Sequence, residues 1–236
     1  CHLKPESEPM ALARRHFMIS GAAALAAPGL ALPGAAQGYQ IALPDDLPQS
    51  PGTIITRVAT SRPQVALTFD DGPHHSLTPA LLDILAARGV RATFYVIGNR
   101  VARHAAIMQR IVAEGHEIGN HTWSHPSLYG YGDTAFLSEI DRTNQVIYDT
   151  VGRPPVTMRP PYGNITARQA ALLYNTRNMA TVLWSVDPQD WMRPGSSVVA
   201  QRIVNGSHPG AVVLSHDIHG PTVRAMPATI DGLAAR

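Results

Sequence analysis

Two adjacent carboxylates, Asp70 and Asp71, follow an apolar run at residues 65–69 and precede a Gly72-Pro73 turn. The apolar run is typical of a buried strand, and a buried strand that ends in two unpaired acids is strongly disfavoured unless the acids face a site. In proteins built of alternating strands and helices, reactive residues gather where the carboxyl ends of strands open into loops. The pair is therefore a candidate for acid–base or metal chemistry, although a solvated turn would have the same sequence.

A second candidate cluster contains His121 and His125, which are four residues apart. If the backbone coils between them, this spacing places both imidazoles on one face, where they can bind a single metal ion. With a carboxylate from elsewhere they form a two-histidine, one-carboxylate set that leaves a coordination position open for water or substrate. The alternative is a pair of surface histidines. The presence of Asp70 and Asp71 favours the metal-site interpretation.

The elements that must position these residues alternate between strands and helices. Pro79 in a first turn and Gly152 after a last turn are typical helix boundary signals. The alternation predicts a single α/β domain over residues 61–236, a parallel sheet covered by helices and either open or closed into a barrel. Strands are expected at residues 65–69, 92–97, 117–119, 156–158, 180–185 and 211–214, and helices at residues 78–89, 102–114, 133–151, 166–174, 197–204 and after Pro221.

Three further strand ends lead into chemically reactive residues: Arg159, the Asp190-Trp191 pair, and His216. Each has a structural alternative, namely a surface cation for Arg159, a helix cap for Asp190, a core side chain for Trp191 and a satisfied buried imidazole for His216. A parallel sheet or barrel gathers the carboxyl ends of its strands on one rim. Five independent structural explanations at five successive strand ends are improbable, so we expect one common site.

These residues lie in five segments that resemble, in order, the motifs of the polysaccharide deacetylases, also called carbohydrate esterase family 4 or the nodulation-protein-B homology domain. The form of the motifs is especially close to that of bacterial peptidoglycan N-acetylglucosamine deacetylases. The resemblance implies a distorted (β/α) barrel with fewer than eight repeats, a divalent metal, and hydrolysis of N- or O-acetyl groups on a sugar polymer. It covers roughly residues 52–234, with motifs at 68–73, 121–125, 159–163, 187–191 and 214–217.

The resemblance also implies roles for individual residues. Asp71, His121 and His125 would bind the metal, with zinc preferred over cobalt or nickel. Asp70 would be the catalytic base, held ionised and oriented by Arg159. The other implied roles are an oxyanion-hole backbone N–H at Tyr162, a general acid at His216 oriented by Asp190, and the walls of an acetyl pocket at Pro161, Trp191 and Leu214.

Composition narrows the remaining function classes. The sequence has 236 residues, 44% hydrophobic and 15% charged, which is enough for one core of moderate size. The formal net charge of +2 gives no indication of nucleic-acid binding. The single cysteine is Cys1, so the sequence offers neither a disulfide framework nor a thiol nucleophile within the domain.

The first 36 residues have the features of an export signal. Arg14-Arg15 resembles a twin-arginine signal and follows Met10, a plausible start. The Ala-rich apolar run after it is too short and interrupted for a membrane span, and its end suits cleavage after Ala36. An N-terminal extension without a signal is the alternative. We expect a linker and first strand region at residues 37–60, and an exported monomer, in the periplasm or outside the cell, without stable membrane insertion.

The expected substrate is an N-acetylated polysaccharide or oligosaccharide of the peptidoglycan or chitin type. An O-acetyl ester on acetylated xylan is the alternative, because the acetyl-handling residues would be shared. A catalytically silent carbohydrate-binding relative is a second alternative, but every implied metal ligand, the base and the acid are present. Tyr129 and Tyr131 could stack on a sugar or be ordinary loop aromatics, and His219 could contact sugar. Family members usually carry a further short strand after the last helix, which the sequence does not show before Arg236.

Overall fold

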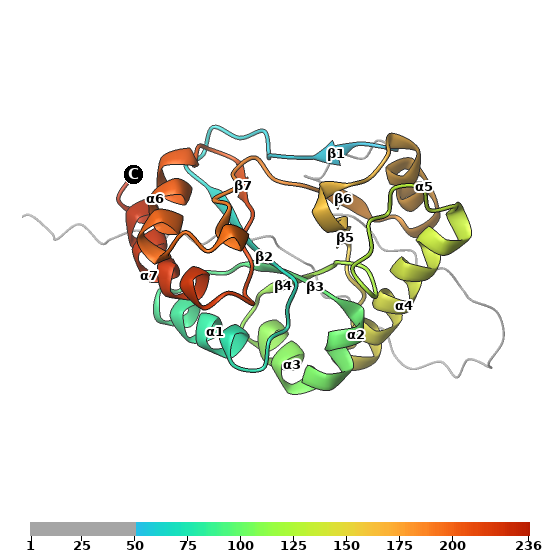
Figure 1. Ribbon diagram of the computed structural model, residues 1–236, viewed down its shortest axis with the longest axis horizontal. Helices are drawn as coiled ribbons and strands as arrows, with labels where there is room; N and C mark the ends of the chain where they lie inside the picture. The colour runs from blue at the N-terminus through green and yellow to red at the C-terminus, as the bar shows by residue number, and fades with distance from the viewer. Residues whose placement is uncertain (1–50) are drawn as a thin grey trace, which may run out of the picture.

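The computed structural model describes residues 51–236. In this part of the chain seven parallel strands form one sheet, which curls and carries its helices on the outside (Figure 1). The predicted α/β barrel with fewer than eight repeats is confirmed. The predicted export signal and most of the predicted linker lie outside the described residues.

The sheet has the strand order β1-β6-β5-β4-β3-β2-β7. The strands are β1 Ile54–Ile55, β2 Val65–Asp70, β3 Thr93–Val96, β4 Glu117–Asn120, β5 Thr157–Met158, β6 Ala180–Val182 and β7 Ala211–Val213. The helices are α1 Leu77–Ala87, α2 Gly98–Val101, α3 Ala105–Ala113, α4 Asp133–Val151, α5 Ala167–Arg177, α6 Ser196–Gly206 and α7 Gly220–Ala234, with 3₁₀ turns η1 Ala102–His104, η2 Pro161–Gly163 and η3 Asp190–Met192.

Backbone hydrogen bonds bring the two ends of the strand order together. Strand β7 pairs with β2 along one edge. Along the other edge the N–H groups of Ser185 and Val186 donate to the carbonyl of Val212 at 3.0 and 3.1 Å, and Leu214 N–H donates to the carbonyl of Val186 at 2.9 Å. The chain that leaves β6 therefore binds β7, and the sheet closes on itself at its carboxyl end. This closure brings the strand ends to one rim.

The two faces of the sheet bury different sets of side chains, as the two-residue period of a strand requires. In β3, Phe94 packs outward in a core with Leu81 and Met108 from the covering helices. The next residue, Tyr95, packs inside the barrel with Val212. The interior is therefore filled by side chains, and a polar residue placed there must be supported by specific partners.

Two predicted elements differ from the observed ones. The helix expected at 102–114 begins earlier and is divided into α2, η1 and α3, because the N–H groups of Gly98 and Asn99 bind the carbonyls of Thr122 and Trp123 at 2.9 and 3.1 Å. The strand expected at 180–185 ends at Val182, because the following residues change partner from β1 to β7. Within residues 51–236, no helix combines the length and the apolar character needed to cross a bilayer.

Candidate active site and metal centre

Three predicted metal ligands meet at the carboxyl end of the sheet. Asp71 Oδ1 lies 3.4 Å from His121 Nε2 and 3.1 Å from His125 Nε2, and one ligand atom from each residue lies within 4.8 Å of the others. Asp71 Oδ1 is buried and accepts no hydrogen bond within residues 51–236. A buried carboxylate oxygen without a donor, next to two imidazole nitrogens, fits a shared divalent cation, and this donor set is typical of zinc with an open position. The residues therefore fit the metal that the sequence implies.

The histidines are oriented by their neighbours. His121 Nδ1 donates to the carbonyl of Arg159 at 2.7 Å, so the lone pair of Nε2 is free to face a metal. His125 N–H donates to Thr122 Oγ1 at 3.1 Å. The loop is not a helical turn, because Thr122 and His125 both have left-handed backbone conformations, with φ of 66° and 61°. The condition of a helical coil between the two histidines is therefore not met, and the two imidazoles converge through the loop instead.

The backbone of Asp71 has a left-handed conformation and is held by an arginine. Its φ is 72°, and its carbonyl accepts a hydrogen bond from Arg100 at 2.6 Å. Burial opposes ionisation of Asp71, yet the close approach and positive charge of His121 and His125 bring the pKa of this carboxyl well below its ordinary value. The carboxylate is therefore ionised across the neutral pH range, as a metal ligand must be.

Asp70 pairs with a fully buried arginine. Arg159 NH1 lies 2.7 Å from Asp70 Oδ1 and also donates to Thr68 Oγ1 at 2.7 Å. The other guanidinium nitrogens donate to the carbonyls of Val182 and Leu183 at 3.2 and 2.9 Å. Asp70 Oδ2 lies 3.8 Å from His121 Nε2, so the second carboxylate oxygen is directed towards the metal ligands. The two adjacent aspartates thus have different surroundings, one among imidazoles and one on a guanidinium.

His216 forms a buried pair with Asp190 on the other side of the site. His216 Nδ1 lies 2.8 Å from Asp190 Oδ1, and Asp190 Oδ2 accepts from His216 N–H and Thr222 Oγ1, both at 2.8 Å. Burial lowers the pKa of His216, but hydrogen bonding and charge from Asp190, with smaller contributions from Asp70 and Asp71, raise this pKa to about 9. His216 is therefore an imidazolium at neutral pH and can donate a proton.

Removing the Asp190 charge is expected to shift the alkaline limb of the activity profile. A raised pKa keeps His216 protonated below about 9, so activity that needs the imidazolium is lost as pH rises through that value. A bound cation lowers the pKa of His216, which places the alkaline limb of the profile between about pH 6.5 and pH 9. Asp190→Asn should move the limb about 1–2 units towards acid, because the charge that stabilises the imidazolium is gone. Profiles of kcat/KM against pH test this, and Thr222→Val, which keeps the charge, is the control.

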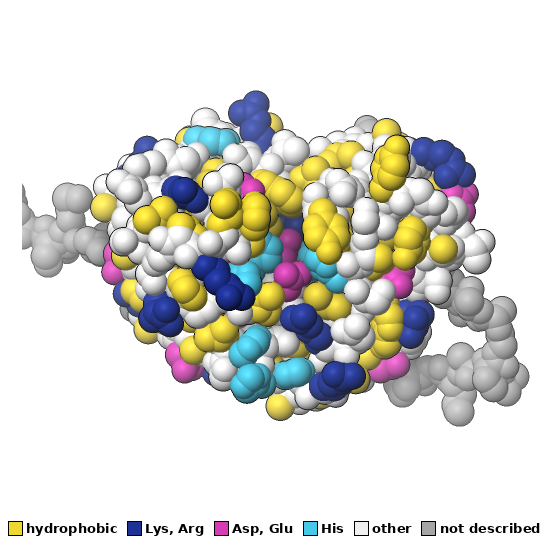
Figure 2. All heavy atoms as spheres, in the orientation of Figure 1, with side chains coloured by type: hydrophobic (Ala, Val, Ile, Leu, Met, Phe, Trp, Pro, Cys, Tyr) yellow, Lys and Arg dark blue, Asp and Glu magenta, His cyan; other side chains and the backbone are white. Residues whose placement is uncertain are grey.

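The remaining predicted residues surround the same region. Tyr162 has a left-handed backbone, with φ of 60°, and its ring lies 4.9 Å from that of His125 in an edge-on contact. Pro161 and Leu214 are buried, whereas Trp191 is 53% exposed. Figure 2 shows this face hollowed at its centre, with histidine and acidic side chains inside the hollow. The structure therefore gathers the predicted residues, and their catalytic roles stay predictions.

Several supporting residues were missed by the sequence analysis. Tyr95 lies beneath Arg159, with 4.2 Å between its ring centroid and the guanidinium carbon, and Gly119 provides the space, since a Cβ there would lie 2.3 Å from the Tyr95 ring. Thr68 and Thr222 place hydroxyl groups on Arg159 and Asp190. Thr68 could have been found from the sequence, because it is a polar residue at an inward position of the apolar strand β2. Only the tertiary structure identifies the other three.

Asp217, the residue after His216, lies in a restrictive environment. It is fully buried, and one oxygen accepts a hydrogen bond from Thr78 Oγ1. The carboxyl packs against Gly72, where an added Cβ would lie 2.6 Å from Asp217 Oδ2. Burial raises the pKa of Asp217 to about 7. Asp217 thus connects the segment after His216 to the turn that follows Asp71.

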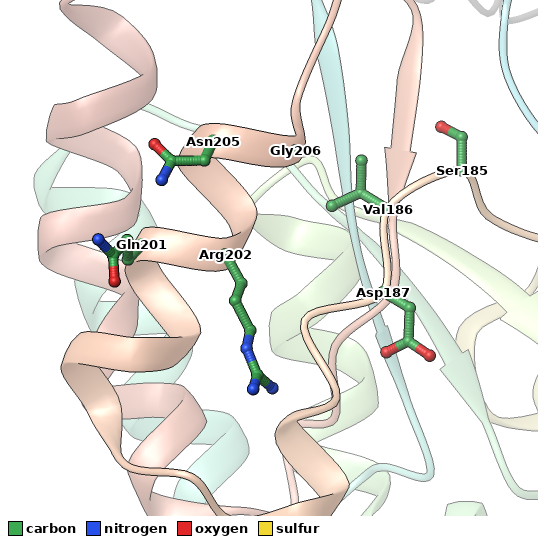
Figure 3. A pocket seen from close by; sticks show the side chains of 7 residues that line it. All are labelled: Ser185, Val186, Asp187, Gln201, Arg202, Asn205 and Gly206. Atoms are coloured by element: carbon green, nitrogen blue, oxygen red, sulfur yellow. The ribbon is translucent and has the colours of Figure 1, made fainter.

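A separate cavity of about 560 Å³ lies beside α6, and none of the three metal ligands lines it (Figure 3). Arg202 extends from α6 into it and donates to the carbonyl of Pro188 at 2.9 Å. This contact supports the loop that carries Asp190 from outside the site. The residues that line the cavity are Ser185, Val186, Asp187, Gln201, Arg202, Asn205 and Gly206.

Comparison with known proteins places these features in a family. A family model described as polysaccharide deacetylase matches residues 57–179. The peptidoglycan-N-acetylglucosamine deacetylase PgdA of Listeria monocytogenes is 36% identical over 178 residues, which are 75% of this chain and 37% of that protein. A chitooligosaccharide deacetylase of Rhizobium leguminosarum is 43% identical over 162 residues, 67% of this chain and 69% of that protein. The chain thus spans well under half the length of the Listeria relative.

Two solved structures have the same fold. A peptidoglycan N-acetylglucosamine deacetylase, Bc1960, in complex with a substituted N-hydroxybenzamide, has a TM-score of 0.73 and 34% identity, and the match covers 78% of this chain and 87% of that one. A family pseudoenzyme from Bacillus anthracis has a TM-score of 0.74 and 28% identity, covering 78% and 65% of the two chains. The fold therefore occurs in a protein described as a deacetylase and in one described as a pseudoenzyme.

Proposed function

The chain belongs to the polysaccharide deacetylase family, and we propose that it is a metal-dependent hydrolase that removes the N-acetyl group from N-acetylglucosamine residues of peptidoglycan or chitin-type oligomers and releases acetate. One observation supports this above the others. The Asp71, His121 and His125 cluster occurs together with a carboxylate fixed on a buried guanidinium and a histidine that is protonated at neutral pH. Hydrolysis of an amide needs these elements together.

Asp71, His121 and His125 would hold the metal, and zinc suits their donor set best, with cobalt or nickel as substitutes. When bound, the ion would lower the pKa of water to about 7 and polarise the acetyl carbonyl. The chain itself supplies the orientation of the ligands. The hydrogen bond from His121 to the carbonyl of Arg159 fixes the tautomer that leaves Nε2 free.

Asp70 would act as general base. Its Oδ1 is occupied by Arg159, and its Oδ2 is directed towards the metal ligands, where it can accept a proton from the attacking water. Arg159 makes one hydrogen bond to Asp70, and three further hydrogen bonds to other groups of the protein hold the guanidinium in place. The carboxylate is therefore kept in one orientation. The base is therefore held in place before substrate binds.

His216 would act as general acid. A sugar amine is a poor leaving group unless it is protonated, and the imidazolium stabilised by Asp190 can donate that proton. The backbone N–H of Tyr162 would donate to the oxygen that gains negative charge, an interaction whose loss typically costs about 3 kcal/mol. Because the backbone supplies the donor, replacement of the Tyr162 side chain should be tolerated.

Trp191, Leu214 and Pro161 would form the pocket for the acetyl methyl group. Leu214 and Pro161 are buried and give fixed walls, whereas Trp191 is partly exposed at the edge. A small apolar slot prefers acetyl to longer acyl groups, although one extra methylene changes binding by only about 1–3 kcal/mol.

Two other functions have specific support. An O-acetyl esterase acting on acetylated xylan would use the same base, acid and pocket, because both reactions pass through attack of water on an acetyl carbonyl. A silent carbohydrate-binding protein is represented among similar structures by the pseudoenzyme. The intact cluster of Asp71, His121 and His125, together with the Asp190–His216 pair, favours an active enzyme over a silent one.

Action outside the cytoplasm fits both the proposed polymer substrates and the export signal expected in residues 1–36. We take the active form to be a monomer, exported by the twin-arginine route and free of stable membrane insertion. Secretion of a reporter fused to residues 1–60 tests the route. Replacing Arg14-Arg15 by lysines should block it, whereas secretion that is unaffected would contradict the twin-arginine assignment.

The experiment that decides between these functions is release of acetate from three polymers: peptidoglycan, N-acetylglucosamine oligomers and acetylated xylan. Acetate from the first two, and little from xylan, is the expected result. Acetate from xylan alone would establish the esterase, and acetate from none, with binding retained, would establish the silent relative. Loss of activity on exhaustive chelation, and its recovery with zinc or cobalt, is the control for metal dependence.

A further inference from the structure

The carboxylates at the floor of the site each have a cationic partner. Asp70 is bound to Arg159, Asp190 to His216, and Asp71 belongs to the metal cluster. The floor therefore has little negative charge left to repel an anion. The charge around the mouth of the site is decided by the residues at its rim.

Arg193 lies at this rim and carries a positive charge without a partner. It ends η3 directly after Trp191 and Met192, and its N–H donates to the carbonyl of Asp190 at 2.8 Å, which ties its backbone to the acid pair. Its side chain is exposed, and within residues 51–236 the guanidinium makes no hydrogen bond or ion pair. The surface arginines Arg88, Arg168 and Arg177, in contrast, are all paired with aspartates.

His219 lies next to His216 and is within range of the charge of Arg193. Its ring centroid is 5.7 Å from that of His216. Burial lowers the pKa of His219, and the positive charge of Arg193 acts in the same direction. His219 is therefore neutral at neutral pH and can offer one ring N–H as a hydrogen-bond donor.

A second arginine lies next to the metal ligands. Arg100 is partly buried and donates to the carbonyl of Asp71. Figure 2 shows arginine side chains on both sides of the hollow that contains the histidine and acidic side chains. The opening is therefore flanked by fixed positive charge, and a cleft of this kind concentrates anionic ligands.

We propose that Arg193, together with His219, binds a carboxylate of the substrate next to the acetylated sugar, so that the enzyme prefers a glycan that carries carboxylates to a neutral one. Peptidoglycan has such groups in its lactyl and peptide substituents, whereas chitin-type oligomers do not. The planar guanidinium matches a carboxylate with two parallel hydrogen bonds, which makes arginine the suitable cation here. This inference rests on the proposed deacetylase function and selects one substrate class within it.

The test compares kcat/KM for soluble peptidoglycan fragments and for an N-acetylglucosamine tetramer in the metal-loaded protein. Arg193→Gln is expected to lower the ratio of the two values about tenfold, because the lost pair is charge-assisted. Arg193→Lys should recover part of the ratio, since it restores the charge without the planar fork. Arg62→Gln, which removes an exposed arginine before the amino end of β2, is the matched control and should leave the ratio unchanged.

Ionic strength provides an independent readout. Raising the salt concentration from about 0.05 M to about 0.5 M should lower the wild-type ratio, because the screening length falls several-fold, and should have little effect on the ratio of Arg193→Gln. Equal ratios in wild type and Arg193→Gln at low salt would overturn the inference while leaving the deacetylase function intact. If neither glycan releases acetate, the proposed function fails. Calorimetric binding of the fragments then tests Arg193 directly, and equal affinity in both proteins overturns its role.

Discussion

Asp70→Asn is expected to lower kcat about a thousandfold while the protein still binds one metal ion. Asparagine fits the same space and keeps a carbonyl oxygen near Arg159, but it cannot accept a proton from water, and general base catalysis typically contributes factors of 10²–10⁴. The metal ligands are Asp71, His121 and His125, so metal affinity should change little. Turnover of N-acetylglucosamine oligomers and titration of the apoprotein with zinc give the two measurements.

His125→Ala is the matched comparison, because it removes a ligand and leaves Asp70 in place. Both the metal and the activity should be lost in this variant. A variant that keeps the metal but loses activity identifies a base, whereas a variant that loses both identifies a metal ligand. The sequence position of two adjacent aspartates does not by itself make this distinction. Near-normal turnover by Asp70→Asn would show that the base has been assigned to the wrong residue.

Arg159→Met is expected to reduce both stability and activity. The substitution leaves the buried Asp70 carboxylate without its cation, and breaking a buried ion pair from one side typically costs about 3–5 kcal/mol. For a domain of this size that corresponds to a fall in melting temperature of roughly 10 °C. Activity should fall at least a hundredfold, because the base loses its fixed orientation. Calorimetry or chemical denaturation, together with turnover, measures both effects.

The double variant Asp70→Asn/Arg159→Met makes this prediction specific. If the loss of stability comes from the unpaired carboxylate, removing that charge should recover part of it, although activity stays low. Arg159→Lys keeps a charge but cannot reach Asp70, Thr68 and two carbonyls at once, so an intermediate loss is expected. A fall of less than about 1 kcal/mol in the Met variant would show that the pair is not structurally important.

Much of the fold was predictable from the sequence because strand periodicity and helix boundary signals are local. The regions at 65–69, 133–151 and 211–214 agree closely with β2, α4 and β7. The errors are at positions where distant backbone groups decide the outcome. The early start of α2 depends on carbonyls of the histidine loop, and the early end of β6 depends on a change of strand partner. Local sequence contains neither fact.

The site was predictable in its main residues for a related reason. Reactive side chains at strand ends must converge on one rim, so the identities of Asp70, Asp71, His121, His125, Arg159, Asp190 and His216 could be read from the sequence. The supporting groups could not, because Tyr95, Thr222 and Asp217 are ordinary residues until the tertiary structure places them against the site. Their importance comes from contacts between segments far apart in the chain.

Left-handed backbone conformations are concentrated in the loops of the site, and this has a consequence for how the protein would respond to selection. Among the described residues, the non-glycine residues with positive φ in these loops are Asp71, Thr122, His125, Tyr162, Gln189 and Arg193. Each such conformation typically costs 1 kcal/mol or more. Selection for heat resistance alone would therefore favour glycine at these positions. At Asp71 and His125, which belong to the metal cluster, the same change would slow the enzyme, so thermal tolerance and catalytic speed oppose each other there.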